Sequence, residues 1–340
     1  MIRFIQNELR SKDVQDIIGS YLKKTDFPKR WILLTDYCLD AQDKSNVITF
    51  VLLHYQNEGE YAALEQKISI LQKSDIKHTR YISNKLMRYL KRLPVFSFSF
   101  ILDNRDKLFG DTVEEQQKAV IDNFVAVKDC FQVWLKGAPN RDICNYYKES
   151  IKKIDAQIKV VMKGKIIKLH EDILLTAFLG ALYTAEILKN VPNLEIVGWF
   201  PDRDKITQSC DGIAIPLFHC MLHYYLGGRD VVFPVANPKM KGAPFYDVLN
   251  RIPDNICAAV ADYNISYPSV SKKKFSHVLH ELMAGNDYVR IHSLYKDSTS
   301  FHFSTICYRT NLLMSIRFYL QTAVRELTGF AKKMKSRICQ

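Results

Sequence analysis

The chain has 340 residues, of which 47% are hydrophobic and 25% charged, and 48 Lys and Arg against 36 Asp and Glu give a formal net charge of +12. This composition excludes an intrinsically disordered chain and is typical of a folded protein of one or two domains. The basic balance favours nucleic acid or a nucleotide as partner, while a protein partner or a homo-oligomer remains open.

Cysteine usage and hydropathy bear on location. The eight cysteines are spread along the chain and form no Cys-x-x-Cys pair. The first residues lack the apolar core of a secretory signal. Polar residues interrupt the longest apolar run, residues 173–188, which is also shorter than a membrane span of about 20 residues. We therefore expect reduced thiols, a cytoplasmic protein and no membrane partner.

The first part of the chain alternates predicted helices and strands. Residues 1–29 are predicted to form an N-terminal helical segment. Two apolar runs rich in strand formers, 30–40 and 47–55, predict an antiparallel hairpin. Residues 61–93 have apolar positions at helical spacing, and the alternating Phe and Ser of 95–103 predict a strand.

Helices dominate the middle of the chain. Thr112 and Glu115 are spaced as a capping box, which predicts a helix start. Residues 140–190 predict two helices that break around residues 163–165. A buried strand over 194–200 and an apolar helix over 211–226 follow.

The alternation of predicted strands and helices predicts an α/β fold, with a C-terminal α/β elaboration over 228–340. In the elaboration we expect a short strand at 231–234, a loop at 237–244, a strand at 256–262, a helix at 273–284, strands at 288–295 and 300–308, a helix at 310–330 and a basic tail at 332–337.

Acidic residues follow the predicted strands. Asp36, Asp103, Asp202 and Asp204 lie at or just past strand ends, and Asp211 begins the next helix. Crowded carboxylates repel one another, and a divalent cation relieves this repulsion. We predict these five as ligands of Mg²⁺ or Mn²⁺, with Asp36, Asp202, Asp204 and Asp211 catalytic in phosphoryl transfer. The alternative is structural, since aspartate also favours turns and helix starts.

This order of elements, together with two short motifs, resembles the ribonuclease-H-like superfamily. The motifs are Asp36-Tyr37-Cys38-Leu39 and Cys210-Asp211-Gly212-Ile213-Ala214. They are most similar to a group of uncharacterised bacterial proteins with Asp-Glu-Ser-Gly and Ala-Asp-Leu-Ile-Ala type motifs, although only Asp36 matches in the first. The resemblance covers residues 30–227 and implies a ribonuclease-H-like core with a mixed central sheet flanked by helices. It also implies a metal-dependent nuclease site at Asp36, Asp202 or Asp204, and Asp211, with Asp103 as a fourth candidate.

Histidines and cysteines offer further candidates. His219 and His223 share a helix face, but no third metal ligand is apparent, so we interpret them as a core or interface pair. His277 and His280 also share a face and are candidates for a general base or a phosphate contact. Cys38 and Cys210 lie beside the acids, but a cysteine nucleophile needs a partner base that the sequence does not identify.

Basic and aromatic residues suggest contacts with nucleic acid. The candidate phosphate contacts are Lys163, Lys165, Lys168, Lys272, Lys273 and Lys274, for which the alternative is a solvated face. The candidates for stacking on bases are Tyr146, Tyr147, Tyr224 and Tyr225, for which the alternative is the core. The preferred function is a divalent-metal-dependent nuclease or phosphodiesterase. The alternatives are a non-catalytic subunit of a bacterial complex that binds nucleic acid or a protein partner, and an enzyme acting on a small nucleotide.

Overall fold

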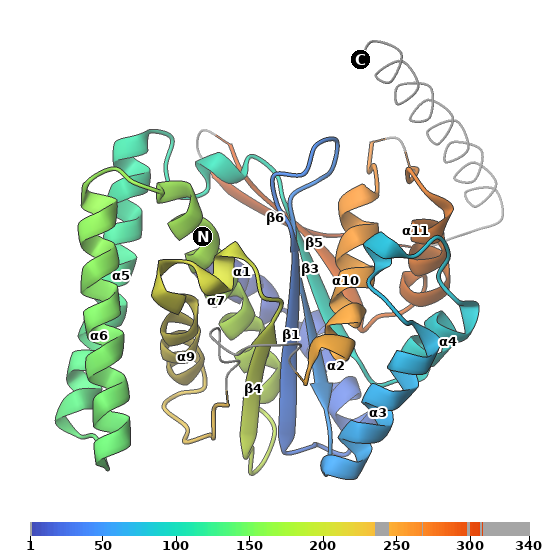
Figure 1. Ribbon diagram of the computed structural model, residues 1–340, viewed down its shortest axis with the longest axis horizontal. Coiled ribbons are helices and arrows are strands. Elements are labelled where there is room, and N and C mark those ends of the chain that lie inside the picture. The colour runs from blue at the N-terminus through green and yellow to red at the C-terminus, as the bar shows by residue number, and fades with distance from the viewer. Residues whose placement is uncertain (1, 235–244, 267, 298–299, 307, 309–340) are drawn as a thin grey trace. The chain divides into compact units, whose positions relative to one another are not determined.

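The computed structural model describes residues 2–234, 245–266, 268–297, 300–306 and 308 (Figure 1). The loop, helix and tail predicted at 237–244, 310–330 and 332–337 lie outside these residues. The chain folds into two compact units, each assembled from three stretches. The first unit comprises Met1–Ile32, Asn104–Pro244 and Tyr295–Phe301, and the second comprises Leu33–Asp103, Phe245–Leu294 and His302–Gln340.

The strands form one six-stranded sheet in the order β4-β1-β2-β3-β5-β6. β2 pairs antiparallel with β3, whereas β3 pairs parallel with β5, so the sheet is mixed. The predicted α/β class with a mixed sheet is therefore confirmed. The strands are β1 (Arg30–Cys38), β2 (Val47–His54), β3 (Phe96–Leu102), β4 (Ile196–Pro201), β5 (Val289–Lys296) and β6 (Phe301–Ile306).

The pairing of β2 with β3 explains the alternating Phe and Ser of the sequence. Phe50 lies opposite Phe98, and their rings stack with centroids 5.2 Å apart. Thr49 lies opposite Ser99, and their hydroxyls form a hydrogen bond of 2.8 Å. All of β3 is buried, so the serines satisfy their hydroxyls within the sheet instead of facing water.

Helices of the first unit pack in pairs. α6 lies along α5, and α7 packs against α9 (Figure 1). Nearly every residue of α7 is buried, as its continuous apolar sequence requires. The helices are α1 (Ile2–Leu9), α2 (Lys12–Lys24), α5 (Val113–Lys136), α6 (Arg141–Met162), α7 (Ile167–Leu188), α8 (Lys205–Gln208) and α9 (Ala214–Tyr225), with short 3₁₀ turns at Arg105–Lys107 and Cys210–Gly212.

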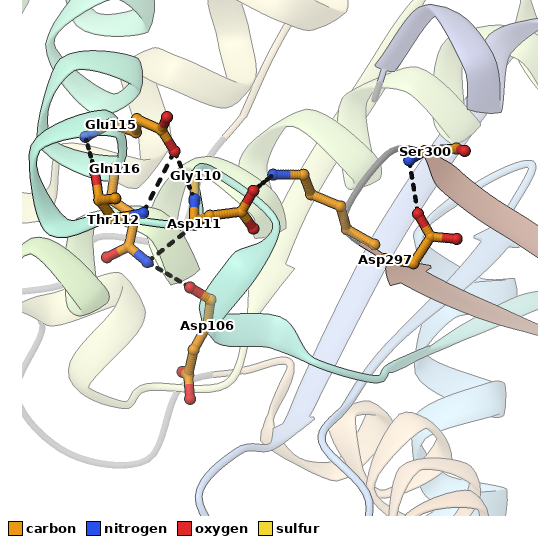
Figure 2. A network of polar contacts seen from close by, with 9 residues as sticks. Asp106, Gly110, Asp111, Thr112, Glu115, Gln116, Asp297 and Ser300 are labelled. Carbon is orange, nitrogen blue, oxygen red and sulfur yellow. Dashed lines mark hydrogen bonds and ion pairs between the residues drawn. The ribbon is translucent and has the colours of Figure 1, made fainter.

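The start of α5 is the predicted capping box (Figure 2). The hydroxyl of Thr112 accepts a hydrogen bond from the backbone N–H of Glu115 at 3.2 Å. Glu115 Oε2 in turn accepts from the backbone N–H groups of Asp111 at 2.7 Å and Thr112 at 3.3 Å. Asp111 also pairs with Lys296 at 3.2 Å, which ties this helix start to the stretch around β5 and β6.

In the second unit α10 packs on β2 and β3. The strand predicted at 256–262 is wrong, because these residues form the second half of α10. The run is buried around most of its circumference, so it lacks the polar positions that reveal helical spacing. The helices are α3 (Glu58–Leu71), α4 (Asn84–Arg92), α10 (Asp247–Asp262) and α11 (Lys273–His277), with a 3₁₀ turn at Ile76–His78 and a π-helix at Val278–Met283.

Two smaller expectations are met in part. The short strand predicted at 231–234 is a single parallel bridge between Val232 and Ile196. The predicted helical region 61–93 contains α3 and α4 with a 3₁₀ turn between them. In the part of the chain that the structure describes, no helix is both long and apolar enough to span a bilayer.

Candidate functional site

The five predicted metal ligands divide between the two units. Asp36 and Asp103 belong to the second unit, whereas Asp202, Asp204 and Asp211 belong to the first. Among the described residues, no three His, Cys, Asp or Glu side chains are grouped so that they could hold a metal ion. We therefore derive no catalytic step through a metal, and the Mg²⁺ or Mn²⁺ site stays a prediction.

Asp204 and Asp202 are engaged in local backbone structure. Asp204 caps α8, where its Oδ1 accepts from the backbone N–H groups of Ile206 at 2.8 Å and Thr207 at 3.3 Å. Burial raises the pKa of the Asp204 carboxyl to about 6. Asp202 Oδ1 accepts from the backbone N–H of Arg203 at 2.8 Å. Asp204 therefore has the structural role that aspartate often takes at a helix start.

Asp211 does not begin a helix as predicted. It is exposed in the Cys210–Gly212 turn with φ 59° and ψ 28°, and α9 begins three residues later at Ala214. The left-handed backbone is one that aspartate tolerates better than most residues. Asp103 is also exposed, and its Oδ2 accepts from the hydroxyl of Ser293 at 3.1 Å.

Asp36 lies among residues of the second unit that sequence reasoning did not connect. Burial, followed by the charge of Asp36, raises the pKa of the Cys257 thiol. Burial also raises the pKa of Cys38, with smaller contributions from Asp36 and Asp262. Asp262, at the end of α10, accepts from the hydroxyl of Ser271 at 2.7 Å. Asp262 was not among the predicted ligands, and it lies at the end of a helix instead of the predicted strand.

The cysteines beside the acids are not activated nucleophiles. The Cys38 thiol carries a raised pKa for the reasons given, and burial raises the pKa of Cys210 to about 11. A reactive thiolate requires the opposite shift. Both thiols are therefore protonated at neutral pH.

The predicted phosphate contacts differ in exposure. Lys163, Lys165, Lys272 and Lys273 have exposed side chains, and exposed Lys168 pairs with Asp106 at 2.9 Å. Lys274 is an exception, because it is only 5% exposed and its Nζ donates to the backbone carbonyls of Ile76 and Thr79. Its predicted role as a phosphate contact is therefore wrong, since the ammonium is enclosed in the second unit.

The first unit contains a cavity of about 500 Å³ around His219 and His223, which we call the histidine pocket. The sequence interpretation of these histidines as a core or interface pair did not foresee that both line a cavity. The full lining is Ile143, Tyr146, Tyr147, His219, Leu222, His223, Asp230, Val231, Val232 and Phe233. These residues come from α6, α9 and the segment after α9.

His219 is held in a fixed position inside the histidine pocket. Its Nδ1 lies 3.0 Å from the hydroxyl of Tyr146. Its ring stacks on Phe233, with centroids 5.0 Å apart and planes 9° apart. Burial, with a smaller contribution from His223, lowers the pKa of His219 to about 4. Burial also raises the pKa of Tyr146, so at neutral pH both partners of this hydrogen bond are uncharged.

His223 occupies a more open position. Its ring makes an edge contact with Trp134, with centroids 4.6 Å apart. Burial lowers its pKa, and the negative charge of Asp230 opposes this shift. His223 is therefore a neutral base at pH 7 whose protonated form a nearby carboxylate would stabilise.

The other histidine pair does not share such a cavity. His280, in the π-helix, has its Nε2 3.3 Å from the hydroxyl of Tyr308. Burial lowers its pKa, and neighbouring Glu281 opposes the shift. The cavities described around the second unit's residues do not include His277 or His280 in their lining.

The fold is an α/β fold built on a six-stranded mixed sheet, and the histidine pocket is a candidate site because its lining brings together two histidines and a carboxylate. Comparison with protein-family models, with curated proteins and with solved structures found no match. Any function must therefore be argued from the chemistry of the pocket.

Proposed function

We propose that the first unit binds a small heteroaromatic molecule, of the nucleobase or nucleoside class, in the histidine pocket and transfers a proton through His223. The observation that carries this proposal is a cavity of about 500 Å³ whose lining combines aromatic rings with two histidines. Small-molecule sites commonly enclose roughly 300–1,000 Å³. An aromatic wall that stacks on a base contributes about 1–3 kcal/mol to binding.

The charge of the lining favours a base over a phosphate. Among the described residues that line the pocket there is no lysine or arginine, and Asp230 contributes a negative charge. A phosphate group would meet this carboxylate without a compensating cation. We therefore expect nucleosides to bind more tightly than their 5′-monophosphates.

The two histidines take different roles in this proposal. A Tyr146 hydroxyl that donates to His219 Nδ1 leaves the proton of the neutral ring on Nε2, which then donates to a ligand carbonyl or ring nitrogen. His223 accepts a proton from the ligand, and Asp230 stabilises the imidazolium that forms. His219 positions the ligand, and His223 is the general base.

Calorimetric titration tests the binding. We expect at least one of adenosine, guanosine, cytidine and uridine to bind, and the Tyr147→Ala and His219→Ala variants to bind it about tenfold or more weakly. Tyr224→Ala is the matched control, because Tyr224 is an exposed ring of α9 outside the lining. The proposal fails if no nucleoside or free base binds, or if the control variant loses as much affinity as the pocket variants.

Proton transfer is tested separately from binding. His223→Gln should retain ligand affinity within a few-fold but lose the turnover of any nucleoside that the parent protein converts, because Gln forms hydrogen bonds without accepting a proton at neutral pH. Trp134 contacts the His223 ring, so its fluorescence reports occupancy in each variant. Equal turnover in His223→Gln and the parent protein would show that His223 is not the general base.

A further inference from the structure

A second cavity lies in the second unit and shares no residue with the histidine pocket. It encloses about 310 Å³ where the end of β2 meets α3 and α4, and we call it the α3–α4 cavity. Its lining is Leu53, His54, Tyr55, Glu60, Ala63, Leu64, Lys67, Tyr89, Leu93 and Pro94. The volume is at the lower end of the range for small-molecule sites.

Two opposite charges line this cavity at separate points along α3. Glu60 and Lys67 are seven residues apart, so they lie on one face of the helix, two turns and roughly 10 Å apart along its axis. Glu60 Oε2 accepts from the backbone N–H of Gln56 at 2.7 Å, which fixes the carboxylate at the start of the helix. The cavity therefore has an acidic end and a basic end.

Neutral polar groups also line the cavity. His54 lies near Glu60, and burial lowers the pKa of its ring, so the acidic end offers a neutral imidazole as well as a carboxylate. Burial raises the pKa of Tyr89, so its hydroxyl adds a hydrogen-bond donor to the lining. An ammonium group suits the acidic end, and a carboxylate suits the basic end.

Apolar side chains separate these two ends. Leu53, Leu64, Leu93 and Pro94 line the cavity together with the polar groups. An extended peptide advances about 3.3–3.6 Å per residue, so about three residues span the distance from Glu60 to Lys67. We infer that the α3–α4 cavity is a binding site for a short peptide of about three residues with free termini and an apolar side chain.

End-blocked peptides test this inference on the unmodified protein. Calorimetric titration with Ala-Leu-Ala, its N-acetylated form and its C-amidated form removes the ammonium or the carboxylate one at a time. We expect the free peptide to bind and each blocked form to bind about tenfold or more weakly, because each loses a charge-assisted contact. Binding of the free and blocked forms with equal affinity would overturn the inference, as would no binding of the free peptide at millimolar concentration.

Two variants assign the ends of the peptide. Glu60→Gln keeps an acceptor for the Gln56 N–H and should become insensitive to acetylation while remaining sensitive to amidation. Lys67→Met should show the reverse pattern. Gln66→Ala is the control, since Gln66 is exposed on α3 and outside the lining. If both charge variants lose affinity on acetylation and on amidation as the parent protein does, the peptide does not bind in the α3–α4 cavity. Nucleoside binding in the histidine pocket is measured separately, so either proposal can fail alone.

Discussion

Glu171 provides a sharp test of the electrostatics of the first unit. It lies in the first turns of α7 and is only 5% exposed, and its Oε1 is buried without a hydrogen-bond partner among the described residues. Burial raises the pKa of its carboxyl from 4.5 to about 7, with Asp172 and Asp106 adding to the rise and Arg105 and Lys168 opposing it. The folded protein therefore holds this proton more tightly than the unfolded chain does.

The sign and size of the effect follow from proton linkage. Between about pH 4.5 and 7 the folded state binds more protons at Glu171 than the unfolded state, so the free energy of unfolding falls as pH rises. The stability that the protonated Glu171 contributes is fully present below pH 4.5 and lost above about pH 7. At 1.36 kcal/mol per pH unit, the interval from 4.5 to about 7 corresponds to roughly 3 kcal/mol.

Glu171→Gln removes the titration while keeping the shape of the side chain. Relative to the parent, we expect its free energy of unfolding to increase by roughly 2–3 kcal/mol between pH 5 and pH 8. Urea denaturation followed by circular dichroism at several pH values measures this difference. Glu149→Gln, at an exposed position of α6, is the matched control for the loss of one carboxylate. A pH-independent offset for Glu171→Gln would refute the reasoning.

Three further predictions concern the acids and the buried lysine. Asp204→Ala should lower the free energy of unfolding by about 1 kcal/mol in urea denaturation at about pH 4, below the raised pKa of the Asp204 carboxyl. Asp204→Asn, which can still cap α8, should change it by a few tenths at the same pH. Lys274→Met should cost roughly 2 kcal/mol or more in the same assay, because two buried carbonyls lose their donor, whereas exposed Lys273→Met should be nearly neutral. The metal-dependent nuclease stays a prediction: the double variant Asp202→Asn and Asp211→Asn should abolish Mg²⁺-dependent cleavage of nucleic acid, and undiminished cleavage would contradict it.

Local features were predictable because the interacting residues are neighbours in sequence. The capping box joins Thr112 and Glu115 across a single turn, so its spacing alone predicted the start of α5. The alternation of Phe and Ser similarly predicted β3. The helix at 256–262 was missed because burial on nearly every side removes the contrast between apolar and polar positions on which periodicity depends.

The candidate site was predictable only in part. The four-residue spacing of His219 and His223 places both on one face of α9, and this much is visible in the sequence. Tyr146 reaches His219 from a position 73 residues away, and no local pattern joins the two. The aspartates were prominent because they follow strands, but a residue at that position also caps the next helix, as Asp204 does. Only the hydrogen bonds from the backbone N–H groups of α8 show that Asp204 is a helix cap.

The interleaving of the two units along the chain has a consequence for engineering. Each unit draws on three separate stretches, so the chain passes from one unit to the other repeatedly between Ile32 and His302. No single cut separates the two units, since any fragment that contains one unit whole also contains pieces of the other. Transplanting either unit into another protein would therefore require rejoining its stretches with new connections.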